Sequence, residues 1–149
     1  MANTEVKALT SVKRVFICSP FRGTGRNETE KAVSYRENAK LAKKACFFAV
    51  LSGCIPYAPH LYYPRFLMDS DPEEREVGML MGLAWLGQCS EIWIIGRIVS
   101  AGMAREIRKA KEWGIPVKHY VEERTTEERL LDVILHPEIE YHEMIMREE

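Results

Sequence analysis

Short apolar runs alternate with longer amphipathic stretches along this chain, and that alternation limits the fold more than any other feature of the sequence. Apolar runs bounded by turn residues predict strands at 15–18, 54–59, 91–96 and 115–120. Helical spacing of apolar residues predicts helices at about 28–51, 72–88, 101–113 and 126–135. Strands this short and apolar, each followed by a helix, predict an α/β fold with a parallel sheet covered on both faces.

The order of the strands follows from the handedness of their connections. Right-handed crossovers favour a doubly wound, flavodoxin- or Rossmann-like sheet of four or five strands, with the first and third strands adjacent. A length of 149 residues suits one domain with a substantial core. We therefore expect a single domain over 1–149, with a core at about 13–135 and an acidic C-terminal tail at 136–149.

Charge and composition exclude several classes of partner. Lysine and arginine (21) nearly balance aspartate and glutamate (22), so nucleic acid is not expected as a partner. Residues 1–14 contain no apolar signal-peptide core and no apolar run approaches membrane-spanning length, so no membrane association is expected. The four cysteines form no CxxC pair, which is typical of a reduced, cytoplasmic protein. His119, His136 and His142 lack partners at metal-ligand spacing, so we expect neither a metal nor a cofactor.

The predicted topology also indicates where a ligand binds. In open α/β sheets, ligands bind beyond the carboxyl ends of the strands, at the point where the winding reverses. Here that point lies between the loops at 19–25 (SPFRGTG) and 96–102 (GRIVSAG), which follow the first and third strands. These two loops are also the richest in serine and glycine, so topology and composition predict the same site.

The second loop leads into a helix whose first amides can bind an anion. Ser100 suits the N-cap position, and Gly102 lets a ligand approach the N–H groups that extend to Met103 and have no helical partner. Such a helix end favours an anion, most simply a phosphate. The alternative is that Ser100 only caps the helix, although Met103 is not the Glu or Gln of a capping box.

Glu106 follows Gly102 by four residues, so it lies one turn along the same side of the helix. The helical wheel puts it at the margin of the apolar face, beside Trp113. A half-buried carboxylate that faces a ligand is one interpretation of this position. A surface ion pair with Lys109 is the other.

The loop after the first strand supplies further candidate binding residues. Arg22 can donate charged hydrogen bonds to a phosphate or carboxylate, Phe21 can pack on a ring, and Gly23 allows close approach of the backbone. Ser19 belongs to the same loop, and an ordinary turn is the alternative for the whole segment. His60 follows the second strand at the same edge, where it either lines a pocket for a base or is structural.

Three motifs, CSPFRG at 18–23, IPYAPH at 55–60 and SAGMARE at 100–106, resemble the nucleoside 2-deoxyribosyltransferase-like superfamily. The most similar part is its small, uncharacterised phage and bacterial branch, which is related to 2′-deoxynucleoside 5′-phosphate N-hydrolases. The resemblance covers roughly 14–120. The S-x-G-x-x-x-E element is its most specific part.

The resemblance implies an enzyme that cleaves or transfers the N-glycosidic bond of a small nucleoside or nucleoside 5′-monophosphate. Glu106 would be the nucleophile that attacks the anomeric carbon and displaces the base. Ser100 and Gly102 would hold the 5′ end of the sugar or its phosphate, and Arg22 with its loop would face the sugar or base. A carboxylate suits this chemistry because departure of the base leaves an oxocarbenium-like centre, which it can stabilise or trap.

One position departs from the pattern of the similar hydrolases. They carry an Asp shortly before a Trp-Leu pair, and matching that pair in this chain puts Gly82 at the position of the Asp. The acid that would protonate the leaving base is therefore missing, unless Asp69, Asp71 or Glu76 supplies it. A nucleotide-binding module without turnover is thus the alternative function, and a purely structural flavodoxin-like domain is a third.

The sequence also predicts a homo-oligomer. Residues 77–87 (VGMLMGLAWLG) are apolar almost all round the predicted helix, which is more than one sheet face can cover. Gly78 and Gly82 stand four residues apart, so we expect a second helix to approach there. The alternative is a helix wedged deep in its own core. Homodimers are also usual in the superfamily that the chain resembles.

Overall fold

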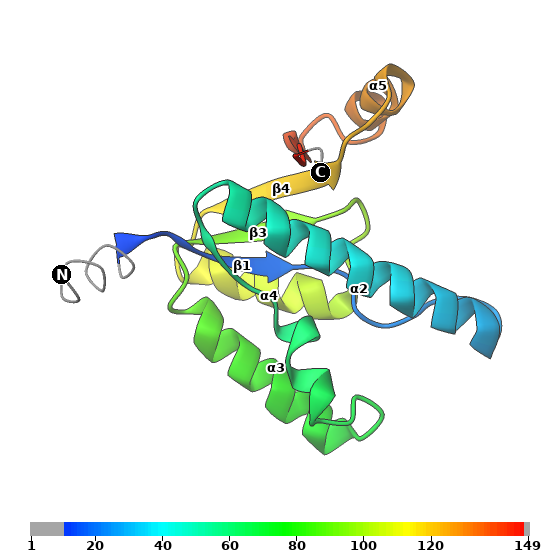
Figure 1. Cartoon of the computed structure of the whole chain (residues 1–149), viewed down its shortest axis with the longest axis vertical. Coiled ribbons are helices and arrows are strands. Elements are labelled where there is room, and N and C mark those ends of the chain that lie inside the picture. Colours follow the sequence, from blue (N-terminus) through cyan, green and yellow to red (C-terminus); the bar gives the residue numbers. More distant parts are fainter. Residues whose placement is uncertain (1–10, 148–149) are drawn as a thin grey trace.

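The computed structural model describes residues 11–147, which form a parallel five-stranded sheet with helices on both faces (Figure 1). The elements follow one another as β1 (Arg14–Cys18), α2 (Glu28–Leu51), β2 (Ile55–Tyr57), the 3-10 turns η1 (Pro59–Leu61) and η2 (Tyr63–Arg65), α3 (Pro72–Leu86), β3 (Glu91–Ile95), α4 (Ala101–Glu112), β4 (Val117–Glu122), α5 (Thr126–Leu135) and β5 (Tyr141–Met144). The strand order is β2-β1-β3-β4-β5. The predicted α/β fold, with the first and third strands adjacent, is therefore confirmed.

The two faces of the sheet carry separate cores, because successive residues of a strand point to opposite sides. Val15 and Ile17 of β1 pack on the side of α2. Phe16 and Cys18 pack on the other side, with residues of α3 and α4. All four are fully buried, which explains why β1 reads as an unbroken apolar run instead of an alternating one.

Each of the longer helices begins at a side chain that caps its first turn. The capping residues of α2, α3, α4 and α5 are Asn27, Asp71, Ser100 and Thr125. Such caps satisfy backbone amides that have no partner inside the helix, so they fix where each helix starts. The helices α2 and α4 follow the loops that leave the carboxyl ends of β1 and β3.

The C-terminal segment differs from the prediction. Tyr141–Met144 form β5, which pairs in parallel with β4, and Met144 is buried in the core on the α2 side. Placing 136–149 outside the core is therefore wrong for these residues. The sequence YHEM is too polar to indicate a strand. In the structure this strand is stabilised partly by ion pairs of Glu143 with Arg124 and Arg129, which an apolar pattern does not reveal.

Three further properties bear on function. Among residues 11–147, no helix combines the length and the hydropathy that a membrane span requires. In the same part of the chain, no cluster of His, Cys, Asp and Glu is arranged to hold a metal ion. All four cysteines are free thiols.

Candidate functional site

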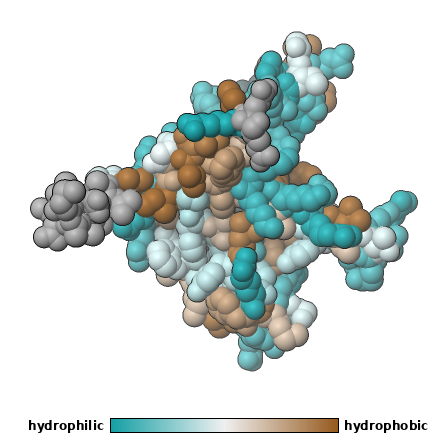
Figure 2. Space-filling model, in the orientation of Figure 1, coloured by the Kyte–Doolittle hydropathy of each residue, from teal (hydrophilic) through white to brown (hydrophobic). Residues whose placement is uncertain are grey.

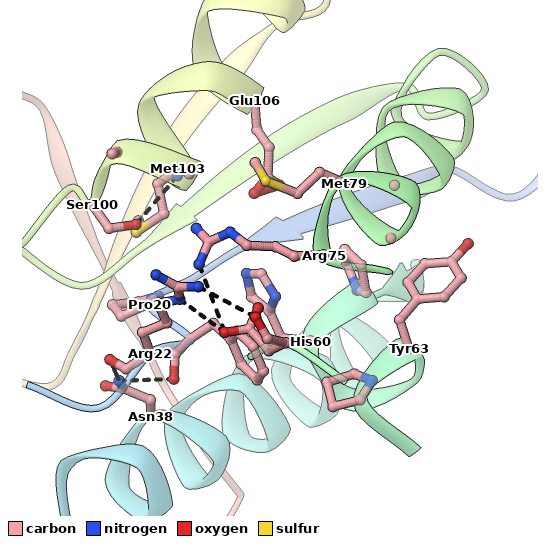
Figure 3. Close-up of a pocket in the computed structure, with 18 of the residues that line it drawn as sticks. Pro20, Arg22, Asn38, His60, Tyr63, Arg75, Met79, Ser100, Met103 and Glu106 are labelled. Carbon is pink, nitrogen blue, oxygen red and sulfur yellow. Dashed lines mark hydrogen bonds and ion pairs between the residues drawn. The ribbon is translucent and has the colours of Figure 1, made fainter. Parts of the chain in front are cut away.

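A cavity of about 390 Å³ lies beyond the carboxyl ends of β1 and β3, between α2, α3 and α4 (Figure 3). This is the edge of the sheet at which the sequence predicts a ligand site. The predicted site residues that line the cavity are Phe21, Arg22, His60, Ser100, Gly102, Met103 and Glu106. Ser19 and Gly23 are not among the residues that line it.

The start of α4 forms one wall of the cavity. The Ser100 hydroxyl accepts a hydrogen bond from the Met103 amide at 3.3 Å, so Ser100 does cap the helix. The amides of Ala101 and Gly102 have no hydrogen-bond acceptor within the described part of the chain. A side chain at Gly102 would meet only Met79 and Ser100, at 3.7 and 4.0 Å, so the glycine keeps space open beside these amides. The cap therefore leaves two donors for a ligand.

Glu106 lies one helical turn further along α4, with its side chain directed between α4 and α3 (Figure 3). The residue is only 7% exposed, and its Oε2 has no hydrogen-bond partner within residues 11–147. Lys109, the alternative partner on the surface, instead pairs with Glu112 at 3.2 Å. Burial raises the pKa of Glu106 to about 8. A buried, unpartnered carboxyl group of this kind is costly to the fold, and such groups are concentrated at functional sites.

Two arginines and an aspartate form the part of the cavity opposite α4. The Arg22 Nε donates to Asp69 Oδ2 at 2.8 Å. Arg75, from the first turn of α3, approaches the same oxygen at 3.7 Å, which is an ion pair without a hydrogen bond. Sequence reasoning missed Arg75. The available signal was its helical spacing from Gly78, Met79 and Gly82, which line the cavity from the same side of α3.

The loop after β1 is held in place by α2. The Asn38 amide donates to the carbonyls of Phe21 and Arg22, at 3.4 and 3.1 Å. A Cβ on Gly23 would lie 2.0 Å from the Lys31 carbonyl oxygen, so this glycine is required by contact with α2. Gly23 was expected to make room for a ligand, but in the structure it allows the loop to pack against α2. Ser19 is fully buried and does not line the cavity.

His60 forms part of the floor of the cavity with Phe21. The two rings are stacked, with centroids 4.7 Å apart and planes inclined by 9°. Burial lowers the pKa of His60 to about 4, so the imidazole is neutral under physiological conditions. This side of the cavity is therefore flat, apolar and uncharged, which suits contact with a sugar or base.

Gly82, the position at which the similar hydrolases carry an acid, lines the cavity. Of the carboxyl groups that might replace that acid, Asp71 caps α3 by accepting from the amides of Glu73 and Glu74. Glu76 is bound to Arg105. Asp69 is thus the one of the three substitutes that lines the cavity.

The five-stranded α/β fold of this chain is similar to that of a solved nucleoside deoxyribosyltransferase. The 2-deoxyribosyltransferase of Bacillus psychrosaccharolyticus is 18% identical, with a TM-score of 0.58 over 87% of this chain and 85% of that one. The CMP N-glycosidase BcmB of Clostridium botulinum is also 18% identical, with a TM-score of 0.47 over 91% of each chain. A conserved protein of Enterococcus faecalis V583 is 17% identical, with a TM-score of 0.48 over 85% of this chain and 76% of that one. At these identities the similarity shows the fold alone.

The family itself is shown by sequence. The chain belongs to the family described as a domain of unknown function (DUF7768), whose profile matches residues 13–120. This range includes the whole of the cavity lining. No curated protein matches the sequence.

Proposed function

We propose that this protein cleaves or transfers the N-glycosidic bond of a nucleoside or nucleoside 5′-monophosphate, with Glu106 as the nucleophile. The observation that carries the proposal is the buried, unpartnered carboxyl group of Glu106, one helical turn beyond two free amides. A sugar whose 5′ end is held at Ser100 and Gly102 extends about 5 Å along α4. Its anomeric carbon then lies beside Glu106.

In this mechanism the ionised Glu106 attacks the anomeric carbon. The bond from that carbon to the base nitrogen breaks, its electron pair leaves with the base, and a bond to the carboxylate oxygen forms. Water attacks the same carbon to complete hydrolysis, or a second base attacks it to complete transfer. The bond from that carbon to Glu106 then breaks and its electron pair returns to the carboxylate, while the proton lost by the attacking group passes to the base that left. Because burial raises the pKa of Glu106 to about 8, the reactive carboxylate is a minority form near neutral pH, and the rate rises as the pH approaches that value.

The departing base also needs a proton. Gly82 cannot supply one, and Asp69 is the candidate because, unlike Asp71 and Glu76, it lines the cavity. The Asp69 carboxylate already accepts a hydrogen bond from Arg22 Nε at 2.8 Å. This arrangement favours a second candidate function, a nucleotide-binding module that retains the cavity and lacks turnover.

Replacement of Glu106 by Gln separates the two functions. Deoxynucleosides and their 5′-monophosphates, with each of the common bases, are incubated with the wild-type protein and free base is measured by chromatography. If the protein is an enzyme, Glu106→Gln should reduce base release by about a thousandfold or more while calorimetry shows binding retained. Glu112→Gln, on the exposed side of the same helix, should leave both unchanged.

The outcomes discriminate clearly. Binding without base release by the wild-type protein would establish the binding module and exclude catalysis. Normal base release by the Glu106→Gln variant would show that Glu106 is not the nucleophile. Absence of binding to every nucleoside and nucleotide would remove both functions.

A further inference from the structure

Arg75 places a buried hydrogen-bond donor in the cavity without an acceptor for it. Its Nη1 is inaccessible to solvent and has no hydrogen-bond partner within residues 11–147. The nearest carboxylate oxygen, Oδ2 of Asp69, is 3.7 Å away and is already bound to Arg22 at 2.8 Å. A buried guanidinium nitrogen without an acceptor is costly, so an anionic ligand that displaces Asp69 and accepts from Arg75 in its place is stabilised at this position.

The charges around the cavity are also unbalanced. Arg22 and Arg75 are opposed by the single carboxylate of Asp69. Burial keeps His60 neutral by lowering its pKa to about 4, and keeps most of Glu106 protonated near neutral pH by raising its pKa to about 8. The cavity therefore has one positive charge in excess before a ligand enters, which favours an anion.

The position of Arg75 relative to α4 indicates which part of the ligand carries that anion. Figure 3 shows the Arg75 side chain extending from α3 into the space between Ser100 and Arg22. The free amides at the start of α4 line the same cavity, and the unpartnered Glu106 follows them by one turn. A phosphate at this point is within the reach of donors from two walls, and the sugar attached to it extends toward Glu106.

We infer that Arg75 makes the cavity specific for a 5′-phosphorylated sugar. Its guanidinium and the first amides of α4 bind the phosphate from opposite sides, and the phosphate replaces Asp69 as the partner of Arg75. Asp69 is thus the internal anion that a ligand displaces. The inference rests on the proposed function for the identity of the ligand, but it concerns binding and does not require turnover.

Ligands without a base test Arg75 separately from base recognition. Calorimetry with 2-deoxyribose 5-phosphate and with 2-deoxyribose gives the preference of the cavity for phosphate as a ratio of affinities. Arg75→Met should lower that ratio by about 10- to 100-fold, because a charged hydrogen bond to the phosphate is lost. Arg75→Lys, which keeps the charge and loses the planar fork, should give an intermediate ratio.

Asp69→Asn provides an effect of opposite sign. Because it removes the internal anion, it should strengthen binding of 2-deoxyribose 5-phosphate several-fold and leave binding of 2-deoxyribose unchanged.

Arg65→Met is the matched control for Arg75→Met, since Arg65 is outside the cavity lining and its Nε donates to the Leu61 carbonyl. Its effect on the ratio should be less than about twofold, as for a distant, screened charge. Thermal unfolding of each variant checks that it is folded.

The inference is overturned if Arg75→Met keeps the phosphate preference, or if the wild-type protein has none. Weaker binding of nucleosides alone in the Arg75→Met variant would place Arg75 at the base and also overturn it. These results are distinct from failure of the proposed function. If the protein prefers the phosphorylated sugar but releases no base, the role of Arg75 in phosphate binding is supported and catalysis is excluded. If it releases base but has no preference for phosphate, catalysis is supported and the role of Arg75 is excluded.

Discussion

Arg105 and Glu76 join α4 to α3 through two parallel hydrogen bonds, in which Nη1 and Nη2 of Arg105 donate to the two carboxylate oxygens at 3.0 and 2.9 Å. Glu106 is the next residue, about 100° further round the helix. Because Arg105 is bound to α3 on the outside, the rotation of α4 that directs Glu106 into the cavity is fixed. Glu76 thus has Arg105 as its partner at the surface. Glu106, which follows Arg105 directly in the sequence, is buried without a partner for its Oε2 among residues 11–147.

The burial of Glu106 should reduce the stability of the folded protein at neutral pH. Its pKa is about 8 in the folded protein, against an ordinary value of 4.5. As the pH rises from about 4.5, the carboxyl group ionises in the unfolded chain while the folded protein retains the proton. Stability is therefore highest below the unfolded pKa and is lost progressively until the pH reaches about 8.

Glu106→Gln should remove this loss. We expect the variant to be more stable than the wild-type protein by roughly 3 kcal/mol at about pH 7, and equally stable below about pH 4.5. Urea unfolding at a series of pH values measures the difference. The Glu112→Gln variant controls for the general effect of removing a carboxylate from α4. A gain that is the same at every pH would show that Glu106 is not protonated in the folded protein.

Gly82→Asp should restore an acid to the cavity. A Cβ at this position would lie 3.7 Å from the ring atoms of Pro59, an ordinary contact, so the side chain can be accommodated. If protonation of the leaving base limits the rate, general acid catalysis should raise base release by about 100-fold. Gly82→Asn, which has nearly the same volume and no acidic proton, should produce no such increase. Equal rates for the two variants would assign the effect to packing instead.

The outer face of α3 is the surface on which we expect the protein to self-associate. Val77, Leu80, Met81 and Trp85 are 41%, 51%, 47% and 45% exposed. Figure 2 shows apolar colour over the lower part of the molecule, where Figure 1 places α3. Four neighbouring apolar side chains on one helix face are typical of a surface that another chain covers.

Substitutions on this face should dissociate the oligomer. We expect a homo-oligomer at micromolar concentration by light scattering, and a monomer after combined Leu80→Glu and Met81→Glu substitution, because charges would be buried in the interface. Val50→Glu on α2 is the matched control, since Val50 is 56% exposed and lies on another element. A wild-type monomer would contradict the expectation, and dissociation by Val50→Glu alone would place the interface on α2.

Local patterns in the sequence were sufficient for the arrangement around α4. The spacing from Ser100 to Gly102 and Glu106 specifies one helix face, and the topology of short apolar strands places that face at the ligand-binding edge of the sheet. Neither inference requires knowledge of a distant contact. For that reason, the fold could be predicted, and a position of Glu106 at the ligand-binding edge could be given as one of two interpretations.

Other features depend on contacts that a linear pattern does not reveal. Gly78 and Gly82 were expected to admit a helix from another chain, but a Cβ at Gly78 would lie only 3.3 Å from Leu67 of the same chain, so this glycine also serves internal packing. The role of Arg75 depends on the proximity of Asp69, in a loop without regular secondary structure. The strand β5 is held partly by the ion pairs of Glu143. Polar pairing between separate elements leaves no periodic signal.

Glu91 should make the fold sensitive to acid. It is 6% exposed at the start of β3, where Lys13, Lys118 and the Trp93 indole donate to it at 2.8, 3.0 and 2.8 Å. Burial alone would raise the pKa of Glu91, but these donors outweigh it and lower the pKa to about 2. Because the folded pKa is below the ordinary value of 4.5, the stabilisation is complete above about pH 4.5 and is lost as the pH falls toward 2.

Glu91→Gln isolates this contribution, because the amide can still accept from Trp93 and carries no charge for the two lysines. At about pH 7 the variant should be less stable by on the order of 2–3 kcal/mol, and the difference should shrink as the wild-type carboxylate is protonated below about pH 4.5. Denaturant unfolding from pH 7 down to the acid limit of the fold measures it. Glu140→Gln is the control, since that carboxylate is 88% exposed. A difference between Glu91→Gln and wild type that stays constant with pH would mean that the amide perturbs packing, and that the ion pairs of Glu91 do not control acid stability.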